Sequence, residues 1–142
     1  MKKIILWMVV ISFPLISSAQ KLKEKEVPQP VKDAFKNSHK DVKKVEWEKE
    51  GANYEAEFED GETETSVVMD ANGSLLETET ELKISELPPA VVDYISKNYK
   101  GSKIKEVAKI TTSKGIVSYE AEVNGKDLIF DSNSKFVKEV KN

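Results

Sequence analysis

Glutamates at alternating positions are the residues of this chain whose type and spacing could do chemistry. Carboxylates gathered on one surface could bind a basic partner protein or Ca²⁺, and carboxylates alone would have to carry any acid–base catalysis. The alternation with apolar residues predicts strands with one face turned toward a core and the glutamates on the other face. The residues of this predicted acidic surface are Glu46, Glu48, Glu55, Glu57, Glu64, Glu77, Glu79 and Glu81.

Two interpretations of this surface remain open on the sequence. Like charges on neighbouring strands repel, so such a face favours a cationic partner. The candidate partner-binding residues are the glutamates just named, except Glu81. Alternatively the glutamates form a solvated sheet face, with lysines such as Lys43, Lys49 and Lys83 supplying the counter-charge. Exposed carboxylates in water repel by only about 1 kcal/mol, so such a face can be stable without a partner.

No catalytic constellation accompanies the glutamates. The single histidine, His39, falls at a predicted helix end beside Lys40, where a solvated side chain is expected rather than a general base. The chain has no cysteine, which excludes thiol catalysis and zinc–thiolate sites, and it has no Gly-rich phosphate loop. We therefore expect no enzyme, no catalytic residues and no cofactor.

The segment Asp70-Ala71-Asn72-Gly73 superficially resembles a calcium loop. An EF-hand needs more oxygen ligands and a bidentate glutamate six residues after its glycine, where this chain has Glu79 inside a predicted strand. An Asn-Gly pair is in itself a strong hairpin signal, because glycine and asparagine tolerate the positive φ of a tight turn. The sequence therefore predicts a hairpin here and no metal site.

The N-terminus predicts export. Lys2 and Lys3 precede an apolar run from Ile4 to Ile16, and small residues ending at Ala19 suit a cleavage site, so residues 1–19 are expected to be a signal peptide. The alternative is an N-terminal membrane anchor, for which the run is short. Residues 20–26 are predicted to be a disordered leader, followed by one domain over 27–142. The product is expected to be periplasmic or secreted, with no membrane span after cleavage.

Charge bears on the class of partner. The 142 residues include 22 basic and 25 acidic ones, a net charge of −3, and removal of the two signal-peptide lysines would make it −5. Every basic residue is lysine; arginine, the residue suited to bidentate phosphate and base contacts, does not occur. A mildly acidic chain without arginine is not expected to bind nucleic acid.

Hairpins and helices must position the glutamates. A helix is predicted from Val27-Pro28 to about His39, followed by four strands joined by turns at Glu50-Gly51, Asp60-Gly61 and Asn72-Gly73. Two-residue turns at these sites would set Trp47 opposite Tyr54, Phe58 opposite Thr63, and Met69 opposite Leu76. Each register places the apolar residues on one face.

The same plan occurs twice. Tyr54-Glu55-Ala56-Glu57-Phe58 returns as Tyr119-Glu120-Ala121-Glu122-Val123, and Leu87-Pro88 opens a second helix as Val27-Pro28 opens the first. The predicted repeats are 27–84 and 87–142. By this alignment Lys109 stands where the first repeat has Trp47, which we expect in the core, the alternative being an exposed anchor for a partner.

The order of these motifs resembles a known family. A helix opening with Val-Pro or Leu-Pro, then Val45-Glu46-Trp47-Glu48, Tyr-Glu-Ala-Glu and Asp70-Ala71-Asn72-Gly73, behind an export signal, is similar to PepSY-like (beta-lactamase-inhibitor-like) domains. The resemblance covers Val27 to Val140. It implies an α+β fold of two tandem α-β-β-β-β repeats, with helices packed on one face of an antiparallel sheet.

The resemblance and the acidic surface together favour an exported, non-enzymatic interaction module, inhibitor-like or protein-binding, whose partner is an unknown envelope or extracellular protein. The alternative is a periplasmic protein that binds a small ligand or a cation, for instance in a groove between sheet and helices.

Overall fold

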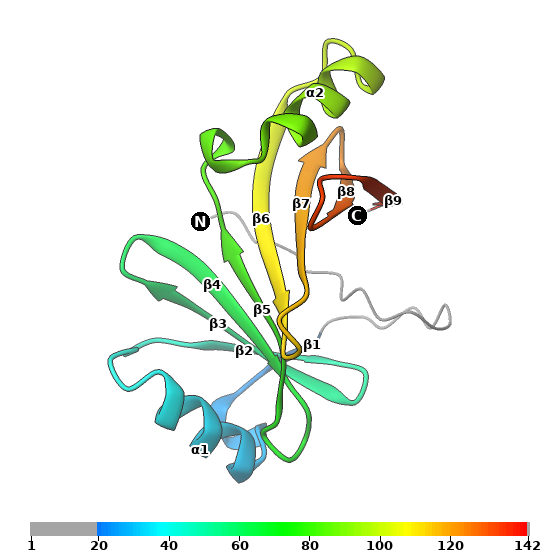
Figure 1. Cartoon of the computed structure of the whole chain (residues 1–142). Coiled ribbons are helices and arrows are strands. Elements are labelled where there is room, and N and C mark those ends of the chain that lie inside the picture. The colour runs from blue at the N-terminus through cyan, green and yellow to red at the C-terminus, as the bar shows by residue number, and fades with distance from the viewer. Residues whose placement is uncertain (1–19, 142) are drawn as a thin grey trace.

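One continuous antiparallel sheet runs through the part of the chain that the structure, a computed structural model, describes, which is residues 20–141. Its strands lie in sequential order and the sheet is strongly twisted, so the two α-helices lie at opposite ends of it (Figure 1). The predicted signal peptide lies outside the described residues. The elements are β1 (Gln20–Leu22), η1 (Glu24–Glu26), α1 (Gln29–Ser38), β2 (Glu46–Glu50), β3 (Asn53–Asp60), β4 (Thr63–Met69), β5 (Leu75–Glu81), η2 (Ile84–Glu86), α2 (Pro89–Asn98), β6 (Ile104–Thr112), β7 (Val117–Val123), β8 (Lys126–Asp131) and β9 (Phe136–Lys141).

Both α-helices follow the same local rules. Each has proline in its first turn, where backbone N–H groups have no partner within the helix and where the fixed φ of proline suits helical geometry. Each helix is ten residues long, and the N–H of the residue that follows it donates to a carbonyl of the last turn. His39 N–H donates to Phe35 O at 2.9 Å, and Tyr99 N–H donates to Ile95 O at 2.8 Å. Residues one turn apart, such as Val31 and Phe35, supply the buried face.

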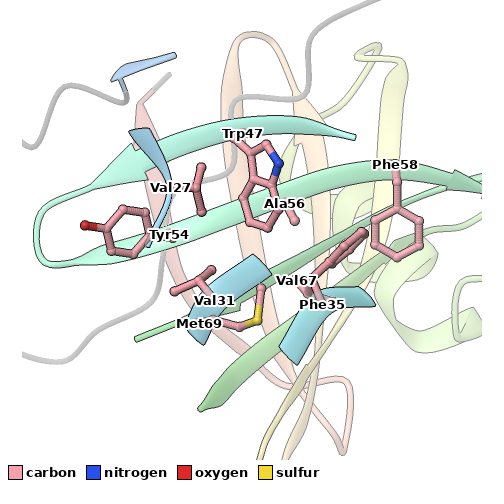
Figure 2. Close-up of a cluster of buried hydrophobic side chains, with 9 residues drawn as sticks. All are labelled: Val27, Val31, Phe35, Trp47, Tyr54, Ala56, Phe58, Val67 and Met69. Atoms are coloured by element: carbon pink, nitrogen blue, oxygen red, sulfur yellow. The ribbon is translucent and has the colours of Figure 1, made fainter. Parts of the chain in front are cut away.

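Each helix closes a separate apolar core over its own half of the sheet. Figure 2 shows the first, where α1 lies over the hairpins of β2 to β4 and Trp47 is buried against the helix. Trp47 is thus a core residue and not an exposed anchor. The second core has α2 over β6 to β8, with Phe130 at its base. Both cores lie on the same face, because cross-strand pairing joins Phe58, Thr65, Thr80, Lys109, Tyr119 and Phe130 in one row. The predicted fold is confirmed.

Residues 20–26 are ordered, contrary to the predicted disordered leader. β1 pairs with β2, with Leu22 opposite Trp47, and the Glu26 carboxylate accepts a hydrogen bond from the Lys23 N–H at 2.7 Å. The second repeat has the same contact between Glu86 and the Lys83 N–H, also at 2.7 Å. The repeated signature Leu-Lys-x-x-Glu-x-Pro therefore begins each unit earlier than the predicted boundaries at 27 and 87.

Two hairpin registers differ from prediction by two residues. Trp47 lies opposite Ala56 rather than Tyr54, and Phe58 lies opposite Thr65 rather than Thr63. The reason is turn chemistry: Gly51 and Gly61 have positive φ and occupy the first central position of each turn, so the preceding acidic residue stays in its strand. A shift of two residues keeps every side chain on its predicted face, and for that reason the fold survives the error.

A bulge explains the third difference. Val67 lies opposite Thr78 as predicted, but Met69 lies opposite Leu75 rather than Leu76, because the register shifts between Val68 and Met69. The extra residue adds local twist beside the β4–β5 turn.

The correspondence between the repeats also differs from the predicted alignment. Val107 pairs with Ala121 as Trp47 pairs with Ala56, so valine rather than Lys109 takes the place of the tryptophan. Lys109 instead lies opposite Tyr119, the position that Lys49 holds opposite Tyr54 in the first repeat. The β6–β7 connection is longer than the β2–β3 turn, which moves the alignment by two.

Gly73 is where the β4–β5 turn approaches α1. It has φ +83°, and a Cβ added there would lie 2.5 Å from Pro30 O and 2.9 Å from the Ala34 Cβ. We expect Gly73→Ala to lower the free energy of unfolding by about 2–4 kcal/mol, the sum of backbone strain and overpacking. Gly115→Ala is the matched control, since Gly115 has φ +79° with nothing within 4 Å of the added Cβ. Urea denaturation measures both, and equal losses would contradict a close helix–turn contact.

Candidate functional site

The predicted glutamates do lie on one face of the sheet, the face opposite the two helices. Pairing places Glu48 opposite Glu55, and the same row continues through Val68 to Glu77. The neighbouring row joins Glu46, Glu57, Ser66 and Glu79, while Glu64 lies opposite Glu59, and Glu81 lies opposite Ala108. We call this surface the acidic face.

Burial divides these residues. Glu46 is exposed and bonded to Lys21; Glu48, Glu57, Glu64 and Glu81 are half-buried. The remaining three are buried: the exposed fractions are 6% for Glu55, 7% for Glu77 and 4% for Glu79. A freely solvated face is therefore wrong for the centre of this surface.

Two further buried acids on this face, Glu120 and Asp127, were missed by sequence reasoning. Glu120 is the counterpart of Glu55 in the repeated Tyr-Glu-Ala-Glu motif, so the repeat itself contained the signal. Asp127 lies next to a hairpin turn, opposite Glu122, and no pattern in the sequence marks it as buried.

Apolar side chains explain why the acids are buried without a covering helix. Val68 lies between Glu55 and Glu77, Ile110 lies opposite Glu79, and Ile129 lies opposite Glu120; all three apolar residues are at most 3% exposed. The central carboxyl groups thus have hydrocarbon rather than water as neighbours. Val68 and Ile129 sit in runs that are apolar at consecutive positions, typical of strands buried on both faces.

Burial is also the main electrostatic influence on these groups. Desolvation, helped by neighbouring carboxylates, raises the pKa of Glu55 and of Glu120 to about 8, although Ser66 acts in the opposite direction on Glu55. The pKa of Glu79 is raised well above its usual value by desolvation first, then by Glu120 and Glu55 among its acidic neighbours. At neutral pH the centre of the acidic face therefore holds protonated carboxyl groups.

Glu57 and Glu64 form a carboxyl pair at the edge of this region. The pKa of Glu57 is raised to about 8 by desolvation, by a hydrogen bond to Glu64 and by the charge of Glu64. Two carboxyl groups that hydrogen-bond in this way share one proton between them.

A hollow opens on the acidic face beside this pair. Three neighbouring strands, β3, β4 and β5, supply its seven lining residues, five of which are glutamates. The lining residues are Glu55, Glu57, Glu64, Thr65, Ser66, Glu79 and Glu81. Oε2 of Glu79 is buried and has no hydrogen-bond partner. An unpartnered buried carboxyl oxygen costs free energy, so the hollow holds unsatisfied acceptor capacity.

The counter-charges on this face lie away from the hollow. Lys21 Nζ pairs with Glu46 at 2.9 Å, and Lys105 Nζ pairs with Glu122 at 2.7 Å. Lys49, predicted to neutralise the glutamates, lies on the helix side, where its Nζ is 3.4 Å from the Tyr54 hydroxyl. The first repeat thus leaves its central carboxyl groups less neutralised than the sequence suggested.

His39 does not contribute to the acidic face. Its ring stacks on Phe35 at 4.9 Å and meets Phe58 edge-on at 4.7 Å, so it belongs to the helix-side core instead of being the solvated residue predicted. No group of three or more His, Cys, Asp or Glu side chains among residues 20–141 is arranged to hold a metal ion.

The Asp70 segment is a hairpin turn, as predicted. One oxygen of Asp70 accepts hydrogen bonds from the N–H groups of Asn72 and Ser74 at 2.8 and 3.0 Å, and these bonds lower its pKa. Asp131 makes the equivalent pair of bonds in the second repeat.

The buried acids predict an unusual dependence of stability on pH. A carboxyl group with a folded-state pKa of about 8 and an unfolded value near 4.5 takes up a proton on folding throughout that interval. The contribution of these groups to the free energy of unfolding should therefore be largest below about pH 4.5 to 5. It should fall as the pH rises to about 8. Each such group contributes up to about 1.4 kcal/mol per pH unit.

Urea denaturation between pH 5.5 and 8.5 measures this slope. Glu120→Gln, which cannot ionise, should flatten it, whereas Asp93→Asn at an exposed site on α2 should leave it unchanged. A stability that rises with pH in wild type would contradict the burial of these acids.

Comparisons with known proteins bear on the whole chain. A family model described as "Putative beta-lactamase-inhibitor-like, PepSY-like" matches residues 15–77 and again residues 52–138. A BLIP-like protein from Bacteroides fragilis is 30% identical, with a TM-score of 0.63 over 81% of this chain and 88% of that one. A protein from Bacteroides eggerthii described as a "putative periplasmic" protein is 16% identical, with a TM-score of 0.70 over 80% and 88% of the two chains, which shows a shared fold.

No curated protein is similar to the chain. Within residues 20–141, no helix has the length and apolar character needed to cross a membrane. The two family matches overlap at residues 52–77 and together cover residues 15–138, most of the chain. The chain belongs to the PepSY-like, beta-lactamase-inhibitor-like family.

Proposed function

We propose that this protein is an exported, non-enzymatic interaction domain whose acidic face binds a basic segment of a partner protein in the envelope or outside the cell. The observation that carries the proposal is the hollow between β3, β4 and β5, where buried carboxyl groups have acidic neighbours and no counter-ion among the described ion pairs. The proposed contact surface is the hollow together with Glu46 and Glu48 beside it.

The duplicated motif is the reason to favour the first repeat over the second. Glu57 and Glu122 are equivalent in the two Tyr-Glu-Ala-Glu segments, yet Glu122 pairs with Lys105 at 2.7 Å whereas Glu57 is hydrogen-bonded to Glu64. A partner lysine near Glu57 would supply the charge that Lys105 already gives Glu122. Such a contact would replace the proton shared by two carboxyl groups with a charge-assisted ion pair.

Separate observations support export and a non-enzymatic role. The predicted signal peptide and the description of the B. eggerthii protein favour export. The family description and the BLIP-like relative fit an inhibitor-like or other binding role rather than an enzyme. The one histidine lies on the opposite face of the sheet from the carboxyl groups, so no histidine–carboxylate pair forms there.

A small-ligand protein with a groove between sheet and helices has less support. The space between each helix and the sheet is filled by an apolar cluster, and the hollow lies on the other face. A free cationic ligand in the hollow itself is a competing occupant that binding experiments can separate from a protein segment.

The proposal predicts salt-sensitive binding of basic peptides. A lysine-rich peptide should bind the protein, its acidic counterpart should not, and the affinity should fall as salt rises, because the attraction between charges is screened. Isothermal titration calorimetry at two salt concentrations measures this.

Paired substitutions test which face is used. Glu57→Gln with Glu64→Gln should weaken binding about tenfold or more, since two charge-assisted contacts are lost. Asp33→Asn with Asp93→Asn removes two exposed carboxylates from the helices on the other side and should leave affinity within about twofold. Equal effects of the two pairs, or no binding of the basic peptide, would rule out the acidic face as the site.

A further inference from the structure

We infer that the hollow is an anchoring pocket for a single lysine side chain of an extended partner segment, with Glu79 as the carboxyl group that receives the ammonium. This inference rests on the proposed function and adds the chemical group recognised and the residue that recognises it.

Glu79 carries the inference because it is buried and unsatisfied at the same time. It is 4% exposed, it lines the hollow, and its Oε2 has no hydrogen-bond partner. A buried polar atom without a partner is rare in folded proteins, and here it belongs to a hollow lined by other acceptors. A ligand that donates hydrogen bonds and carries positive charge satisfies both needs.

The size of the hollow favours a compact cation. Its enclosed part has room for about one water-sized group, which matches an ammonium head better than the larger planar guanidinium of arginine. An ammonium has three N–H donors, so it could bond Glu79 and two further carboxyl groups among Glu55, Glu57 and Glu64. The apolar side chains beside Glu79, such as Ile110, suit the aliphatic stem of lysine.

Binding in this pocket must displace protons. The charged groups that act most strongly on the pKa of Glu79 are acidic: Glu55 on β3, Glu77 on β5, Glu120 on β7 and Asp127 on β8. With no cation among these neighbours, a carboxyl group that is protonated in the free protein would ionise when the ammonium arrives. Affinity should therefore rise with pH between 6 and 8.5, with protons released to the buffer.

The test uses the mature protein and a short acetylated peptide with one central lysine, titrated by calorimetry and by NMR of the glutamate side-chain carboxyl carbons. Matched peptides carry arginine or norleucine in place of the lysine, and spermidine represents a free polyamine. We expect the lysine peptide to bind more tightly than the arginine peptide and spermidine, no binding of the norleucine peptide, and proton release that scales with buffer ionisation heat.

Glu79→Gln should weaken lysine-peptide binding about tenfold or more and abolish the proton release. Asp93→Asn is the control: it removes an exposed carboxyl group from α2 on the other side of the sheet, away from the hollow and from Glu79, so affinity should change by less than about twofold. Circular dichroism verifies that both variants are folded.

The outcomes separate this inference from the proposed function. If Glu79→Gln binds like wild type while the Glu57/Glu64 pair of substitutions weakens binding, the lysine pocket is wrong and the acidic face stands. Tighter binding of spermidine than of the lysine peptide would replace the protein segment by a free polyamine. If neither basic peptide binds, the proposed function fails and the inference fails with it.

Discussion

Carboxyl groups buried against hydrocarbon constrain this structure most strongly. Two ten-residue helices cover the ends of one face of a long sheet, and the other face has apolar residues at its centre that no helix covers. Val68, Ile110 and Ile129 lie among glutamates instead, and the glutamates lose their water. Protonation lowers the free-energy cost of burying these carboxyl groups, because an ionised carboxylate in such surroundings would lose several kcal/mol of hydration.

The two repeats share their features on the helix side of the sheet and differ on the acidic face. On the helix side they share the positions of their prolines, their helix ends and the Asp70 and Asp131 turns. On the acidic face, Glu122 has acquired a lysine partner and Glu57 has not. The two repeats thus share one scaffold and differ, on the uncovered face, in the partner of this equivalent glutamate.

The sequence predicted the fold well because its signals repeat and agree with one another. Period-two alternation fixed which face each side chain occupies, and that assignment survived register errors of two residues at Trp47 and Phe58. The ordered segment at Leu22 was missed although its counterpart at Leu82 was readable, since three residues of strand carry little signal alone.

The site was predicted only in part. Alternation placed Glu55, Glu57 and Glu79 together on one surface, but it could not show that Glu79 is buried. Burial depends on the twist of the sheet and on which side chains of neighbouring strands meet, and local pattern contains neither. Lys49 is a different kind of error: it lies two residues from Trp47 on the same strand, so alternation already places it on the helix side and not among the glutamates.

Side-chain titration tests the central claim most directly. An NMR titration of the glutamate carboxyl carbons from pH 3 to 10 follows each group separately. Glu55 and Glu120 should titrate near pH 8, and Glu79 well above the range of an ordinary glutamate. Midpoints for all three near the ordinary glutamate pKa of about 4.3 would mean that the acidic face is solvated, and would contradict the burial of protonated carboxyl groups at its centre.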